Sequence, residues 1–99
     1  MANTVWIREQ ILATEALLKF ICDHDAMPDL NLQKCLDALR VADIDSAVSH
    51  AQLVKPHGMG GITDWWPPVK YDNEDERYVS SVLQALVNEW CRLMALSFK

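Results

Sequence analysis

Apolar residues recur at helical spacing along most of the chain, beginning with residues 4–24. The apolar positions of this segment stand three or four residues apart and leave only a narrow polar strip between them. They are Trp6, Ile7, Ile11, Ala13, Leu17, Leu18, Phe20 and Ile21. A helix with so little polar surface is expected to pack on several sides, so this pattern predicts a central helix. Asn3 or Thr4 can cap its start, and Glu15 and Lys19 can pair along its polar strip.

Two shorter helices are predicted next, over residues 29–41 and 44–54. Pro28 separates them from the first helix, because proline disfavours helical geometry in the residue before it. The apolar face of the segment 29–41 consists of Leu32, Cys35, Leu36 and Leu39. Asp43 or Asp45 can cap the following helix, which has to end before Pro56.

Residues 74–97 carry the clearest amphipathic pattern in the chain. Their apolar face holds Val79, Val82, Leu83, Leu86, Val87, Trp90, Leu93 and Met94. Asn73, followed by Glu76, has the form of a capping box at the start of this helix. Since no segment shows the alternation of a strand, we predict an all-α fold. It is a compact bundle of about four helices in a single domain that spans residues 1–99.

The segment before the last helix, residues 55–72, is a long loop rich in glycine, tryptophan and proline. Connections of this length are usually functional or packed by their own side chains. Trp65 and Trp66 are adjacent and cannot both face the same way. In one arrangement, one indole packs on the bundle and the other stays exposed, where it can anchor a partner. In the alternative, both rings join Ile62 in closing one end of the core.

Composition and charge exclude several classes of protein. The chain is 51% hydrophobic and 23% charged, which is too apolar for a disordered protein. Its net charge is −5 and its basic residues are scattered singly, so nucleic acid is not an expected partner. The odd number of cysteines, the lack of a signal peptide pattern and the lack of a long apolar run lead us to expect a cytoplasmic protein with no membrane span.

The loop also holds the residues with the most distinctive chemistry. We predict a candidate binding surface formed by His57, Met59, Asp64, Trp65 and Trp66. Asp64 is expected to accept hydrogen bonds from backbone amides of the loop, although it could also act as a base beside His57. The glycines follow no strand and no Gly-Lys-Ser or Gly-Lys-Thr is present, so nucleotide binding is not predicted.

Neither a metal site nor a catalytic centre is predicted. His24, His50 and His57 lie in three different segments and show none of the spacings typical of metal ligands. Cys35 falls within a helical stripe and is expected to be a buried thiol, whereas Cys22 and Cys91 sit at stripe edges where they could be partly accessible. We therefore expect no catalytic residue, no metal ligand and no cofactor.

The block Gly58-Met59-Gly60-Gly61 followed by Asp64 resembles a Gly-Met-Gly-Ser-x-x-Asp block of small, uncharacterised bacterial helical proteins. Gly61 and Thr63 stand where that family tends to have Ser and Asn. Further positions that hold comparable places are Asp45, Ala47 and the helix that begins near Asn73. The resemblance covers about the last 60 residues and implies a helical fold and a bacterial source. It supplies no catalytic residue, because no activity is attached to the family.

Three functional hypotheses follow from the sequence. The first is a non-catalytic protein–protein interaction module, such as an immunity-type or inhibitory partner of a bacterial protein. The second is a self-associating structural protein, in which leftover apolar helix surface forms a two-fold interface and gives a homo-oligomer. The third is a small ligand-binding or enzymatic bundle that uses the loop at residues 57–66, which requires His57 and Asp64 to converge on a cavity.

Overall fold

The computed structural model describes residues 6–98, which form four α-helices and no strand. The helices are α1 (Ile7–Asp23), α2 (Leu30–Arg40), α3 (Ile44–Leu53) and α4 (Glu76–Ala95), with a 3-10 turn η2 (Ile62–Asp64) in the long loop. The all-α prediction is therefore confirmed, and each helix end lies within about one turn of its predicted position. Asn3 and Thr4, the predicted caps of the first helix, lie outside the described residues. None of these helices is long and apolar enough to cross a lipid bilayer.

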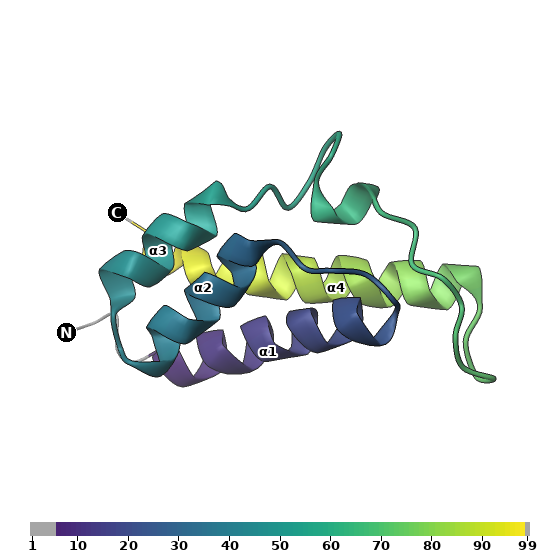
Figure 1. Ribbon diagram of the computed structural model, residues 1–99, viewed down its shortest axis with the longest axis horizontal. Coiled ribbons are helices and arrows are strands. Elements are labelled where there is room, and N and C mark those ends of the chain that lie inside the picture. The colour runs from purple at the N-terminus through teal and green to yellow at the C-terminus, as the bar shows by residue number, and fades with distance from the viewer. Residues whose placement is uncertain (1–5, 99) are drawn as a thin grey trace.

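The two long helices α1 and α4 run side by side in opposite directions, as Figure 1 shows. The shorter helices α2 and α3 pack on each other, and α2 also packs on α1. After α3 the chain runs back along α4, which η2 contacts, and then passes the end of α1 before it turns into the start of α4 (Figure 1). The long loop therefore joins two elements that lie at opposite ends of the bundle.

All four helices supply residues to a single hydrophobic core, as their apolar stripes predict. Its largest fully buried side chains include Leu17, Leu32, Leu39, Val79, Val87 and Met94. Two polar side chains, Gln10 and Thr14, are buried as deeply as these. Thr14 donates from Oγ1 to the carbonyl oxygen of Gln10 at 2.6 Å. Gln10 donates from Nε2 to the carbonyl oxygen of Leu93 at 3.0 Å and to Oγ of Ser97 at 2.7 Å. The bonds made by Gln10 join the start of α1 to the last turn of α4 and the residues that follow it. They satisfy the Nε2 group, whose burial without a partner would be costly.

Aspartates cap three of the helices. Asp29 caps α2 by accepting a hydrogen bond from the amide of Asn31 at 2.7 Å. Asp43, one of the two predicted caps of α3, accepts one from the amide of Ser46 at 3.2 Å. For α4, the predicted capping box of Asn73 and Glu76 is wrong. Its cap is Asp75, which accepts from the amide of Tyr78 at 2.8 Å.

The predicted pair of Glu15 and Lys19 is also wrong. Glu15 instead accepts from Arg40 of α2 at 2.8 Å, while Lys19 pairs with Asp23 at 2.7 Å. The reason is tertiary, because the C-terminal end of α2 brings a guanidinium to Glu15. All four side chains are at least partly exposed, so these ion pairs contribute little to stability.

Trp90 tests the predicted core most directly, because its side chain is only 2% exposed in the middle of the α4 stripe. Replacing Trp90 by Ala should lower the free energy of unfolding by about 3 to 5 kcal/mol, the usual cost of removing a buried aromatic ring. Urea denaturation measures this change. Leu12→Ala is the control, because Leu12 is exposed on α1 and its loss should cost less than about 1 kcal/mol. Equal effects of the two substitutions would contradict the packing described here.

Candidate functional site

The first half of the long loop is closed by its own backbone hydrogen bonds. The amide of Ile62 donates to the carbonyl oxygen of Lys55, and the amide of Thr63 donates to that of Pro56, both at 3.0 Å. The amide of Gly61 closes a tighter turn by donating to the carbonyl oxygen of Gly58 at 2.9 Å. This part of the loop is therefore a folded turn that leads directly into η2, with a tip that rises away from the helices in Figure 1.

Glycine is required in this turn for two different reasons. Gly58 and Gly60 have φ values of +83° and +79°, which side chains other than glycine adopt only with strain. Gly61 has an ordinary φ, but a Cβ atom there would lie 2.6 Å from the carbonyl oxygen of His57. A side chain at position 61 would therefore not fit in this chain without a shift of the backbone.

Asp64 is hydrogen-bonded to the backbone of the loop, which is the first of its two predicted roles. Its carboxylate accepts a hydrogen bond from the amide of Gly60 at 3.1 Å. His57, the other half of the hypothetical acid–base pair, is exposed, and its Nδ1 lies 3.2 Å from Oγ1 of Thr63. The two side chains are thus each engaged with a different part of the turn, and the structure shows no hydrogen bond between them.

The second half of the loop is extended and is held at its far end by Glu74. Between Trp66 and Lys70 the chain is neither helix nor turn, and Pro67 is buried along this stretch. Glu74 then accepts hydrogen bonds from the amides of Lys70 at 3.1 Å and Tyr71 at 3.2 Å. α4 starts later than the capping box predicts, because Asp75 has extended backbone angles and caps the helix itself.

Glu74 also binds His24, the residue that ends α1. Nε2 of His24 lies 3.0 Å from Oε2 of Glu74, and both side chains are buried, with exposed fractions of 4% and 8%. Beside this contact, Lys70 pairs with Asp25 at 2.9 Å. In the sequence, His24 is one of three dispersed histidines and Glu74 stands at the start of a predicted helix, so no local pattern predicts this contact.

Trp65 packs on the bundle. It lies against the core, and its ring meets the ring of Phe20 edge-on with centroids 6.4 Å apart. Phe20 in turn stacks on His24 with ring centroids 4.1 Å apart, and Tyr71 contacts the other side of the imidazole edge-on at 5.9 Å. The loop is therefore attached to α1 by a row of four rings.

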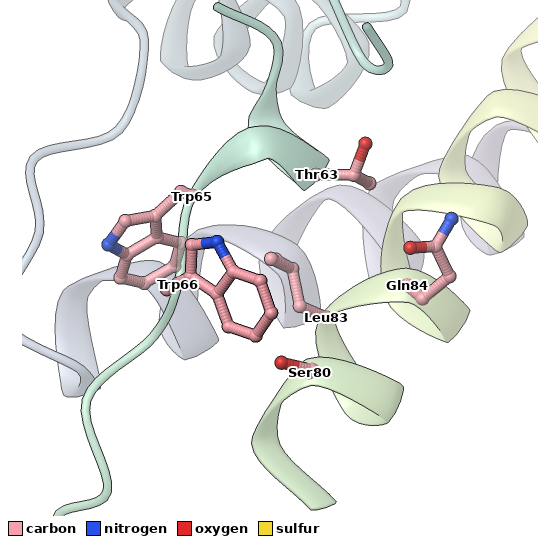
Figure 2. A pocket seen from close by; sticks show the side chains of 6 residues that line it. All are labelled: Thr63, Trp65, Trp66, Ser80, Leu83 and Gln84. Carbon is pink, nitrogen blue, oxygen red and sulfur yellow. The ribbon is translucent and has the colours of Figure 1, made fainter. Parts of the chain in front are cut away.

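Trp66 lies beside α4 and remains 79% exposed. Figure 2 shows its indole turned toward Ser80 and Leu83 while the indole of Trp65 points away from it. Trp66 lines two hollows. The first, of about 180 Å³, is lined by Thr63, Trp65, Trp66, Ser80, Leu83 and Gln84. The second, of about 450 Å³, is lined by Trp66, Pro67, Pro68, Val69 and Glu76.

The five residues of the predicted binding surface thus fall into two groups. Met59, which is 87% exposed, and His57 belong to the glycine turn, whose tip points away from the helices. Asp64, Trp65 and Trp66 form the second group. Asp64 holds the glycine turn through the amide of Gly60, Trp65 packs on α1, and Trp66 faces α4. We name the region around the exposed ring of Trp66 the Trp66 surface. It consists of Trp66 and the side chains other than Trp65 that line its two hollows: Thr63, Pro67, Pro68, Val69, Glu76, Ser80, Leu83 and Gln84.

The thiols differ in burial in the way their stripe positions predict. Cys35 is fully buried, and its burial raises the pKa of its thiol to about 12. Cys91 is half-buried, which also raises its pKa, and Cys22 is exposed. A thiol with a raised pKa is a poor nucleophile near neutral pH. Within residues 6–98, no three His, Cys, Asp or Glu side chains gather as a metal-binding group.

Comparisons of the chain with protein-family models, with curated proteins and with solved structures gave no match.

The two tryptophans should respond differently to truncation, because only one of them packs on the bundle. Trp66→Ala should leave the melting temperature within about 4 °C of the parent, which is about 1 kcal/mol for a domain of this size. Trp65→Ala should cost about 2 kcal/mol or more, since it removes the ring that contacts Phe20. Thermal unfolding followed by circular dichroism measures both variants. Equal losses at the two positions would mean that Trp66 is part of the scaffold.

Proposed function

We propose that the protein is a non-catalytic protein-binding module that docks a partner on the Trp66 surface. The observation that carries the proposal is the exposure of Trp66, whose ring stays 79% accessible although its neighbour Trp65 packs on the bundle. Exposed tryptophan beside a hollow is typical of the residues that dominate binding energy at protein interfaces. Trp66 is therefore the expected anchor of this interface.

The loop does not depend on Trp66 for its shape. Its first half is closed by backbone hydrogen bonds and by the bond from the Gly60 amide to Asp64, and its second half is held by Glu74. Pro67 and Pro68 restrict the backbone immediately after Trp66. A ring on such a backbone loses little conformational freedom when a partner binds, which favours affinity.

Charge indicates the chemistry of the partner. Glu76 lines the larger hollow, and the exposed carboxylates of Asp72 and Asp75 precede it, whereas the nearby Lys70 is already paired with Asp25. The whole chain has a net charge of −5. A partner that presents arginine suits this surface, because a guanidinium stacks on an indole face and pairs with a carboxylate such as Glu76.

Within this proposal the protein is an immunity-type or inhibitory partner of a basic bacterial protein, acting in the cytoplasm. Small size, acidity and a rigid aromatic loop support such a role, and the resemblance of the glycine block supports a bacterial source. The enzymatic alternative needs His57 and Asp64 to face one ligand. Their bonds to Thr63 and Gly60 favour the binding module instead. The self-association alternative would use a second copy as the partner.

A paired capture experiment tests the proposal. Partners retained by the parent protein from cell extract are identified, purified and titrated calorimetrically against Trp66→Ala. We expect a loss of at least about 2 kcal/mol, or roughly 30-fold in affinity, as for a hot-spot aromatic. Glu76→Lys should also weaken binding, and the loss should be larger at low salt than at high salt, because the substitution reverses a charge beside the larger hollow.

Leu12→Ala is the matched control, since it removes an exposed apolar side chain from the outer face of α1. It should bind like the parent. Unchanged affinity of Trp66→Ala would contradict the proposal. Sedimentation of the parent at rising concentration addresses the alternative: a dimer that Trp66→Ala dissociates would assign the same surface to self-association.

A further inference from the structure

His24 is a buried imidazole whose two ring nitrogens both face oxygen atoms. Nδ1 lies 2.8 Å from the carbonyl oxygen of Phe20, one turn earlier in α1. Nε2 lies 3.0 and 3.3 Å from the two carboxylate oxygens of Glu74. A carbonyl and a carboxylate only accept hydrogen bonds, so each nitrogen needs a hydrogen for both contacts to be favourable. The arrangement fits the imidazolium form of His24.

Other titratable groups surround the imidazole. On the loop side, Tyr71 contacts the ring edge-on, and the amide groups of Lys70 and Tyr71 donate to the carboxylate that His24 binds. On the α1 side, Asp25 follows His24 and holds the ammonium group of Lys70. Asp23 precedes His24 and pairs with Lys19. Glu74 is the one carboxylate in direct hydrogen-bond contact with the ring among the described residues.

We propose that His24 is a protonation-dependent latch: its imidazolium form holds the strap at residues 70–74 against the end of α1, and loss of one ring proton releases the strap. A neutral imidazole has one N–H and one lone pair, so one of its two oxygen contacts becomes repulsive. The carbonyl of Phe20 is fixed within α1, whereas Glu74 can turn its carboxylate to water. The contact with Glu74 is therefore the one that opens. This inference stands on the His24 contacts and does not depend on the proposed function.

Glu74 limits the latch on the acid side. Burial opposes the ionisation of Glu74, but the hydrogen bonds from the Lys70 amide, from His24 and from the Tyr71 amide outweigh it and lower its pKa. A carboxyl group with a lowered pKa in the folded state stabilises that state above its ordinary range, and this contribution is lost as the pH falls through the lowered value. The strap is thus closed while Glu74 is ionised and His24 carries both ring protons.

Release of the strap would reach the exposed tryptophan through the chain and through the rings. The strap begins shortly after Trp66, and the ring of His24 stacks on Phe20, which contacts Trp65. When the latch opens, the far end of the extended stretch between Trp66 and Lys70 loses its buried anchor and keeps the exposed pair of Lys70 and Asp25 and the edge-on contact of Tyr71. The Trp66 surface is then no longer held in one conformation.

The latch can be tested on the full chain by nuclear magnetic resonance, with no partner present. Correlation spectra of the ¹⁵N-labelled imidazole rings count the ring protons of His24 as the pH is raised. We expect two ring protons in the closed state. As the second is lost, the hydrogen-exchange protection of the Lys70 and Tyr71 amides, corrected for intrinsic exchange, should fall about tenfold with the same midpoint. Backbone amides of the α4 core, such as that of Val87, should keep their protection.

His24→Gln should abolish this transition, because glutamine does not titrate, while His57→Gln in the other half of the loop should leave it unchanged. Glu74→Gln is the second variant, and it should lower the protection of both amides at every pH. One ring proton on His24 while both amides are protected would overturn the proposal. Amide protection that stays constant while His24 loses a ring proton would also overturn it. This measurement is made on the parent protein, so it does not depend on the folding of any variant.

Discussion

The contact between His24 and Glu74 is the constraint on which the shape of the long loop depends. It joins residues 50 positions apart and brings the chain back to the end of α1 before α4 begins. The same carboxylate gathers the amides of Lys70 and Tyr71, so one side chain both closes a turn and binds it to the bundle. Without this contact, the far end of the segment between Trp65 and α4 would be tied to α1 by the exposed pair of Lys70 and Asp25 and by the ring contact of Tyr71 with His24.

This constraint separates the roles of the two adjacent tryptophans. Trp65 lies on Phe20, which stacks on His24, so its ring extends the core around the end of α1. Extended backbone then turns the next side chain to the opposite side, and the ring of Trp66 comes to lie beside α4. The exposed ring of Trp66 adds little to the core, which is why the proposed binding surface is centred on it.

The helices could be predicted from the sequence because each carries its own apolar stripe. Spacing alone identifies the faces that hold Leu36 in α2 and Leu83 in α4, and burial follows from them. The loop was partly predictable in the same local way: an Asp beside glycines bonds nearby amides, and Asp64 does so. The division of the tryptophans into one packed and one exposed ring was one of two arrangements left open, and the sequence offered no means to choose between them.

The long-range contacts could not be predicted, because no local pattern encodes them. Glu74 has the position of a residue that stabilises a helix start, and only the fold brings His24 within reach of it. Glu15 likewise has a suitable partner four residues away in Lys19, yet α2 presents Arg40 to it. In both cases a local rule gave a reasonable partner, and the packing of two helices supplied a different one.

If the loop is a fixed part of the fold that presents an exposed Trp66, this residue should move no more than the helices do. Relaxation of the backbone and indole ¹⁵N nuclei in the isolated protein measures motion at Trp66 on the picosecond to nanosecond timescale. We expect order parameters for the Trp66 amide close to those of the helices, about 0.85. Values below about 0.6 for Trp66 and its neighbours would show a flexible loop that does not present the ring in one position.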